Sequence, residues 1–141
     1  METFSRETSK LEPWYVTGFL ERAAAFTYSR NQTGFNIYFA VKSPMADRGL
    51  LEQIRSYFGG AGKIYDVGPG AAYYRVSRSA ELSAITRHFD GYPLRGSASA
   101  AYAVWREMVV AKQRFRQPAR ARLERLALEL SSNRSRNRTR P

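Results

Sequence analysis

Apolar and polar residues alternate with two different periods along the chain, and the order of these periods predicts an α+β fold. Apolar residues recur at helical spacing over 13–23, 46–58, 79–89 and 99–114, and again after Pro118. Between these helices the pattern is typical of strands, over 24–30, 34–43, 62–67 and 72–77. The order α-β-β-α-β-β-α-α predicts helices packed on one face of an antiparallel sheet.

The clearest strand runs from Gly34 to Ser43. Its large apolar residues alternate with residues that suit a solvated surface, so one face is expected to be buried and the other to meet a polar partner. Turn residues at 31–34 and 68–70 predict that the strands pair as two hairpins.

The first helix contains one residue that needs an explanation. Pro13 suits a helix start, where its missing N–H has no partner in any case. Gly18, however, lies inside the helix, where glycine costs about 1 kcal/mol relative to alanine. Close approach of a second helix backbone is the usual reason for such a glycine.

Composition limits the class of protein. A chain of 141 residues suits one domain, and it has no cysteine, which excludes disulfides and thiolate metal sites. No apolar run approaches the ~20 residues that span a bilayer, and the N-terminus lacks the apolar run of a signal peptide. An intracellular protein, cytoplasmic or in an organellar matrix and without a membrane partner, is expected. The single histidine, His88, is expected to be structural.

The charge is unevenly placed. The formal net charge is +11, and the stretch from Ala111 to Pro141 alone holds ten Lys or Arg and two Glu. This asymmetry favours a polyanionic partner, most often a nucleic acid. The chain therefore divides into an N-terminal arm (1–12), a folded domain (13–115), an amphipathic helix (116–131) and a basic flexible tail (132–141).

Four segments in order resemble the LAGLIDADG homing endonuclease family. Residues 14–26 match the signature helix and the aromatic residue that opens its first strand. Residues 50–59 resemble the second helix with its closing Phe-Gly, and residues 88–94 the recurrent "hFdkyPL" segment. Tyr102 and Trp105 resemble the aromatic helix that follows. The resemblance covers roughly residues 13–112 and implies an α-β-β-α-β-β-α fold with a saddle-shaped antiparallel sheet, here with an extra C-terminal helix.

The resemblance also implies a partner and an assembly. The family's sheet lies in the DNA major groove, and two signature helices pack along their small residues. A chain with one signature is then expected to form a homodimer on double-stranded DNA, with a two-fold axis through the helix pair. The residues expected at this interface are Val16, Thr17, Gly18 and Leu20.

The chemistry of the family is where this sequence departs from the pattern. In the family the second acidic residue of the signature holds a divalent cation such as Mg²⁺, and this position is Ala23. Alanine offers no oxygen ligand. Glu21 is the remaining candidate for the catalytic and metal-binding carboxylate, and Arg95 is the one cation in the turn where active relatives carry lysines. Cleavage is therefore expected to be weak or lost.

The residues expected to face the nucleic acid come from strand parity and from the basic C-terminal region. On the strands they are Thr27, Ser29, Arg30, Asn36, Tyr38, Lys42, Arg75 and Arg78. Phosphate contacts are expected from Lys112, Arg114 and Arg116, with Arg120 and Arg122 beyond them.

Three other interpretations remain open. The chain would be an active, site-specific endonuclease if Glu21 supplied the metal ligand. It would be an intron maturase or a ribonucleoprotein component if its arginine-rich end bound RNA. It would be a structural dimer or a transcriptional regulator if only the scaffold were in use.

Overall fold

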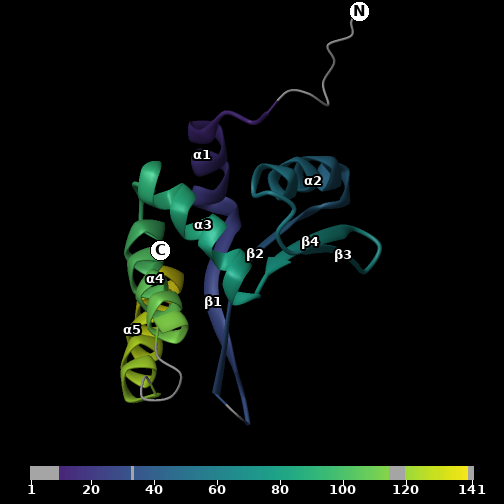
Figure 1. Ribbon diagram of the computed structural model, residues 1–141. Helices are drawn as coiled ribbons and strands as arrows, with labels where there is room; N and C mark the ends of the chain where they lie inside the picture. Colours follow the sequence, from purple (N-terminus) through teal and green to yellow (C-terminus); the bar gives the residue numbers. More distant parts are fainter. Residues whose placement is uncertain (1–9, 33, 115–119, 140–141) are drawn as a thin grey trace, which may run out of the picture.

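The predicted order of helices and strands is confirmed by a computed structural model that describes residues 10–32, 34–114 and 120–139 (Figure 1). The elements are α1 (Pro13–Ala23), β1 (Ala24–Asn31), β2 (Gly34–Pro44), the 3₁₀ turn η2 (Met45–Asp47), α2 (Arg48–Tyr57), β3 (Lys63–Val67), β4 (Ala71–Val76), α3 (Ser79–Gly91), α4 (Ala98–Arg114) and α5 (Arg120–Thr139).

The four strands form one antiparallel sheet in the order β1-β2-β4-β3. Residues 34–41 of the long strand β2 pair with β1, and residues 39–44 pair with β4, so Phe39 is opposite both Phe26 and Val76. The β1–β2 hairpin extends beyond the helices at one end (Figure 1). The predicted α+β class is confirmed, with one face of the sheet packed against the helices.

Phe26, the residue that follows the alanines joining α1 to β1, is the centre of the core. Its ring centroid lies 5.2–5.6 Å from four other rings, those of Phe39, Phe89, Tyr102 and Trp105. Aromatic pairs at this spacing contribute beyond the area that they bury. Because α3, α4 and both strands of the first hairpin supply these rings, one residue fixes where the sheet meets the helices.

Trp105 also binds the sheet through its indole N–H. This group donates to the carbonyl oxygens of Thr27 (3.1 Å) and Tyr38 (3.0 Å), which are paired residues on β1 and β2. The side chain is fully buried, so these bonds satisfy a donor that water cannot reach. They attach α4 to the hairpin where the hairpin leaves the core.

The helix α5 is anchored to β1. Leu123, Leu126 and Leu130 are buried along one side of it. The Tyr28 hydroxyl lies 2.9 Å from Oγ of Ser131, and the Arg30 guanidinium donates to both oxygens of Glu124 at 2.9 and 3.1 Å. The helix continues to Thr139, so residues 132–139 are helical and the expected flexible tail is wrong for them. Pro118, expected to open this helix, lies outside the described residues.

Candidate nucleic-acid interface

The face of the sheet opposite the core holds most of the predicted contact residues. Strand register places Thr27 opposite Tyr38 and Ser29 opposite Asn36 on this outer face, and Lys42 and Arg75 lie on it as well. The alternate residues of β2, Phe35, Ile37, Phe39 and Val41, are at most 7% exposed. The predicted parity of β2 is therefore correct.

Aromatic and basic side chains lie together on the outer face of β2, β4 and β3. Lys42 on β2 is opposite Tyr73 on β4, which is opposite Tyr65 on β3. The Arg75 guanidinium lies over the Tyr38 ring, 3.7 Å from its centroid. This is a cation–π contact that fixes both side chains. The surface thus offers hydrogen-bond donors and exposed ring faces together.

Sequence reasoning did not include Tyr65, Tyr73 or Lys63 among the contact residues. The register places Lys63 opposite Arg75, on the same face as the two tyrosines. Tyr65 is 48% exposed. The alternation of Tyr73 with buried Ala72 and Tyr74 was the signal that would have found them.

Three predicted strand contacts need correction. Arg30 has the parity of the core face, and its guanidinium is paired with Glu124 of α5. Arg78 lies beyond the end of β4, as the residue that precedes α3. Thr27 does face outward in register but is only 8% exposed. The reason for the first error is that Arg30 shares its parity with Phe26 and Tyr28, whereas Ser29 faces outward.

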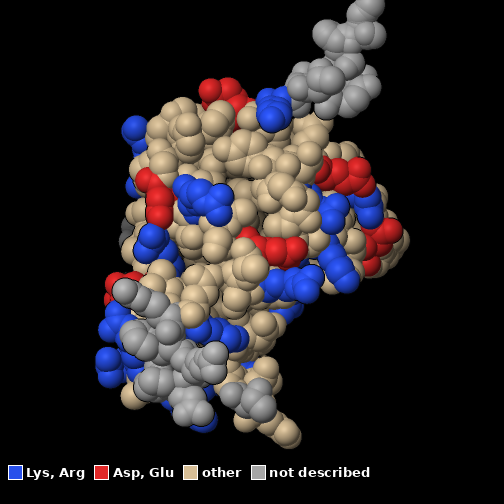
Figure 2. Space-filling model, in the orientation of Figure 1, with Lys and Arg blue, Asp and Glu red and all other residues tan. Residues whose placement is uncertain are grey.

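The basic C-terminal residues lie on the α4–α5 side of the molecule. Lys112 is on α4, and its ammonium donates to the Phe35 carbonyl oxygen at the start of β2. Arg114 is the last residue of α4, and Arg116 lies outside the described residues. Figure 2 shows Lys and Arg gathered over α4 and α5 on the visible face. Exposed residues there include Arg120, Arg122 and Arg125.

Both oxygens of the Glu21 carboxylate accept hydrogen bonds from the backbone. The donors are the N–H groups of Arg95 (2.9 Å) and Gly96 (2.8 Å), so the end of α1 holds the turn before α4. A carboxylate that accepts two backbone donors resembles an anion in a backbone nest. Arg95 itself is exposed, and its backbone, not its guanidinium, contacts Glu21.

The residues present do not fit a divalent cation. Ala23 has no donor atom, and Glu21 is the acidic residue nearest to it on α1. Within the described ranges, no group of three His, Cys, Asp or Glu side chains is arranged to hold a metal ion. In this chain Glu21 joins the end of α1 to the turn before α4, and its metal-binding and catalytic role stays a prediction.

A hollow opens on the outer face of the sheet beside Ala23. It has a volume of about 480 Å³ and is formed where α1 passes into β1, between β2, β4 and the start of α4. Its lining is rich in small residues, and Tyr38, Tyr73 and Lys42 border it: Ala23, Ala24, Ala25, Phe26, Thr27, Tyr38, Ala40, Lys42, Tyr73, Ser97, Ala98 and Ala101.

Most of the residues predicted at an interface between two copies of α1 are buried in the core of their own chain. Val16 and Leu20 are fully buried and Thr17 is 4% exposed, because they face the core. Gly18 is exposed, and a Cβ built on it would meet no atom within 4 Å. The open side of α1 is formed by Trp14, Tyr15, Gly18 and Arg22, with both aromatic residues about half exposed.

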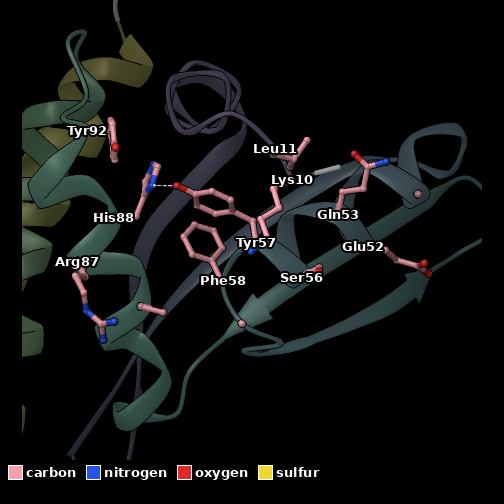
Figure 3. Close-up of a pocket in the computed structure, with 13 residues that line it drawn as sticks. Lys10, Leu11, Glu52, Gln53, Ser56, Tyr57, Phe58, Arg87, His88 and Tyr92 are labelled. Atoms are coloured by element: carbon pink, nitrogen blue, oxygen red, sulfur yellow. Dashed lines mark hydrogen bonds between the residues drawn. The ribbon is translucent and has the colours of Figure 1, made fainter. Parts of the chain in front are cut away.

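A second cleft lies between Lys10 and Leu11, which precede α1, and the helices α2 and α3, and hydrogen bonds of Tyr57 and His88 lie in its wall (Figure 3). The Thr17 hydroxyl donates to the Tyr92 carbonyl oxygen at 2.7 Å, so it accepts from Nε2 of His88 at 2.9 Å. Nδ1 is then the acceptor for the Tyr57 hydroxyl, also at 2.9 Å. Figure 3 shows Tyr57 pointing across the cleft toward His88.

Burial lowers the pKa of His88 to about 4 and raises the pKa of Tyr57. Both groups are therefore neutral at physiological pH. Each group donates to the next in the order Tyr57, His88, Thr17 and the Tyr92 carbonyl. Because His88 is satisfied on both ring nitrogens, the structure agrees with the structural role expected for it. Among the described helices, none combines the length and apolarity needed to cross a bilayer.

Comparison with known proteins gives one consistent result. A family model described as LAGLIDADG endonuclease matches residues 16–109. An uncharacterized 50.9 kDa protein in ND4 intron 1 of Podospora anserina is 29% identical over 117 residues, covering 77% of this chain and 26% of that protein.

Two solved structures are similar in the same way. The LAGLIDADG meganuclease I-CpaMI bound to uncleaved DNA is 30% identical, with a TM-score of 0.68 over 74% of this chain and 37% of that one. I-SmaMI bound to an uncleaved DNA target in the presence of calcium ions is 27% identical, with a TM-score of 0.78 over 87% of this chain and 46% of that one. The chain spans about a quarter of the curated relative and less than half of each of these structures.

Proposed function

The chain belongs to the LAGLIDADG endonuclease family, and on that premise we propose that it binds double-stranded DNA through its sheet without cleaving it. The observation that carries the proposal is the outer face of the sheet, where polar, aromatic and basic side chains are held in register beside an alanine at the family's metal-binding position.

The side chains on this face suit contacts with a duplex. Asn36 can form paired hydrogen bonds with adenine in the major groove, and Arg75 can do so with guanine. Lys42 supplies a charge for phosphate, which raises affinity but carries no sequence information. The similar structures of I-CpaMI and I-SmaMI were both obtained with DNA, which supports a duplex as the partner.

The absence of cleavage follows from the donor set. Family members hydrolyse a phosphodiester with a carboxylate-held divalent cation, which activates water and neutralises developing charge. In this chain Ala23 cannot hold such an ion, and the oxygens of Glu21 already accept two backbone N–H groups. The alternative of an active enzyme would require Glu21 to bind the cation through the lone pairs that Arg95 and Gly96 leave free, from a position two residues before Ala23.

Full recognition of a long site requires a second domain of this fold, which we propose is another copy of the chain. The surface of α1 around Gly18 supports this proposal, because Trp14 and Tyr15 expose apolar area beside a residue with no side chain. A homodimer would contact through these residues and Arg22, instead of the buried Val16 and Leu20.

The binding proposal is tested by selection from a randomised duplex library with the whole chain, followed by titration of the selected duplex. The double variant Lys42→Ala/Arg75→Ala should bind it at least tenfold more weakly. The control is Arg87→Ala, which removes an exposed arginine from the cleft lined by α2 and α3. This variant should change the affinity for DNA little. Preference for single-stranded RNA over every duplex would overturn the proposal and favour the maturase interpretation.

The cleavage proposal is tested on the same duplex with Mg²⁺ or Mn²⁺. The natural chain should leave the DNA intact, whereas Ala23→Glu, which restores a carboxylate, should produce metal-dependent cutting. Cutting by the natural chain would show that another group supplies the ligand, and Glu21→Gln would then identify whether it is Glu21.

A further inference from the structure

The hollow beside Ala23 has the size and the location of a ligand site on the nucleic-acid face. Its volume of about 480 Å³ lies within the range of roughly 300–1,000 Å³ typical of small-molecule sites. Three consecutive alanines, 23–25, leave it open at the end of α1, and Ala40 and Ala101 complete a wall of methyl groups.

Two tyrosines border the hollow, and their surroundings restrict how they move. Tyr38 is held by the Arg75 guanidinium over its ring. Tyr73 lies between Lys42 and Tyr65 across the sheet, and its ring centroid is 6.4 Å from that of Tyr65. Both side chains are half-buried, so each retains exposed ring area toward the outer face.

The polar groups of the hollow are few and lie among its lining. Lys42 is exposed, and Ser97 belongs to the turn that Glu21 holds through Arg95 and Gly96. These two side chains can donate hydrogen bonds to ring nitrogen or carbonyl acceptors. The rest of the lining is mostly alanine and aromatic carbon.

We propose that this hollow holds one unpaired nucleobase of the bound DNA, stacked against Tyr73 or Tyr38. The inference rests on the proposed function, because it uses the same face of the sheet. Enzymes that take a base out of the helix hold it between aromatic or apolar side chains and contact its polar edge with a few donors, which is the composition found here. Stacking on tyrosine also tolerates different bases.

A phosphate fits this hollow poorly. Only Lys42 in the lining is cationic, and a phosphate inside would place its charge in a lining that holds six alanines. A neutral, planar group with polar atoms at its edge avoids this cost. The lining of the hollow therefore favours a nucleobase over a phosphate of the DNA backbone.

The test compares duplexes that differ in how easily one base leaves the helix. The selected duplex is prepared in a perfectly paired form and with a single mismatch or a one-base bulge at each central position, and each is titrated with the whole chain. Because a mismatched base is cheaper to extrude, the natural chain should bind at least one of these forms about tenfold more tightly than the perfect duplex.

Variants locate the base in the hollow. Tyr73→Ala/Tyr38→Ala should weaken binding of the preferred mismatched duplex by about 5- to 150-fold, whereas Tyr73→Phe/Tyr38→Phe, which keeps the rings, should retain it. Ala25→Leu should fill the hollow and abolish the mismatch preference. The matched control is Ala100→Leu on α4, because Ala100 is exposed like Ala25 but does not line the hollow.

The outcomes separate this inference from the proposed function. Equal affinity of the natural chain for perfect and mismatched duplexes, with sequence-selected binding intact, would overturn the base pocket and leave the DNA-binding proposal standing. Retained mismatch preference in Ala25→Leu would also overturn it. Absence of binding to every duplex would overturn both.

Discussion

The carboxylate of Glu21 accepts the backbone N–H of Gly96 at 2.8 Å and joins the last turn of α1 to the turn that begins α4. A Cβ on residue 96 would lie 2.8 Å from the same carboxylate oxygen, so a larger residue there would displace the Glu21 side chain from this contact. The neighbouring N–H of Arg95 occupies the other oxygen. The first acidic residue of the signature thus acts on the chain's own backbone.

This contact predicts a loss of stability when Glu21 is neutralised. Glu21→Gln replaces one acceptor oxygen with an NH₂ group facing a backbone donor, and we expect the free energy of unfolding to fall by about 1–2 kcal/mol in urea denaturation. Glu129→Gln, an exposed carboxylate on α5, is the control. Unchanged stability in Glu21→Gln would show that the carboxylate is free for another role.

The buried histidine predicts a dependence of stability on pH. Burial lowers the pKa of His88 to about 4, below the ~6.5 of an unfolded chain, so the unfolded state takes up the proton first as the pH falls. The contribution is complete above about pH 6.5 and is lost as the pH falls toward 4, by at most about 3 kcal/mol. Denaturation of the natural chain and of His88→Gln at pH 4.5, 5.5, 6.5 and 7.5 measures the difference, and parallel pH curves would contradict the assignment.

The exposed glycine of α1 predicts a variant that separates assembly from folding. Gly18→Leu meets no neighbouring atom within the chain and replaces a poor helix former, so the monomer should gain up to about 1 kcal/mol in stability. The same side chain would prevent close approach of a second helix. Sedimentation should therefore show a dimer for the natural chain and a monomer for the variant; a dimer in both would exclude this face of α1.

The indole N–H of Trp105 predicts a cost that is separate from its volume. Trp105→Phe keeps an aromatic ring in the core but removes the donor shared by the carbonyl oxygens of Thr27 and Tyr38. We expect the free energy of unfolding to fall by about 2–4 kcal/mol, from the smaller ring and the unsatisfied carbonyls together. Amide hydrogen exchange should become faster in the β1–β2 hairpin. Unchanged exchange rates there would show that the hydrogen bonds of the indole N–H do not stabilise the hairpin.

The basic end of α5 predicts a change in salt dependence. Truncation after Asn133 removes four arginines but keeps Leu130 in the core and Ser131 on Tyr28. If each arginine meets one phosphate, the slope of log affinity against log salt should fall by about 3–4 per chain. Unfolding measured in parallel verifies that the fold is intact, and an equal slope would exclude this segment from the DNA contact.

The sequence predicted the elements well, because period-2 and helical patterns along β2 and α1 are set by burial of whole faces. It was less reliable where the direction of one side chain mattered. Ser29 and Arg30 were both assigned to the outer face, although neighbouring residues of a strand cannot share one. The ion pair of Arg30 with Glu124 joins residues 94 apart in sequence, which no local pattern reveals.

The interface of α1 shows a similar limit. Apolar residues along a short helix identify a buried side, but not whether the same chain or another covers it. Val16 and Leu20 are covered by the chain's own core, and only Gly18 among the predicted interface residues is on the open side. The engagement of Glu21 was also beyond the sequence, because its partners are backbone groups 74 and 75 residues away.

The anchoring of β1 by α5 has a consequence for the order in which the protein is completed during synthesis. The hydroxyl of Tyr28 contacts Ser131, which is synthesised 103 residues later. The indole N–H of Trp105 donates to the carbonyl oxygen of Thr27, 78 residues earlier in the chain. The first hairpin can form early from local contacts, but its fastening to the helices needs nearly the whole chain. On a ribosome, the face proposed to bind DNA would therefore be among the first parts made and the last to become rigid.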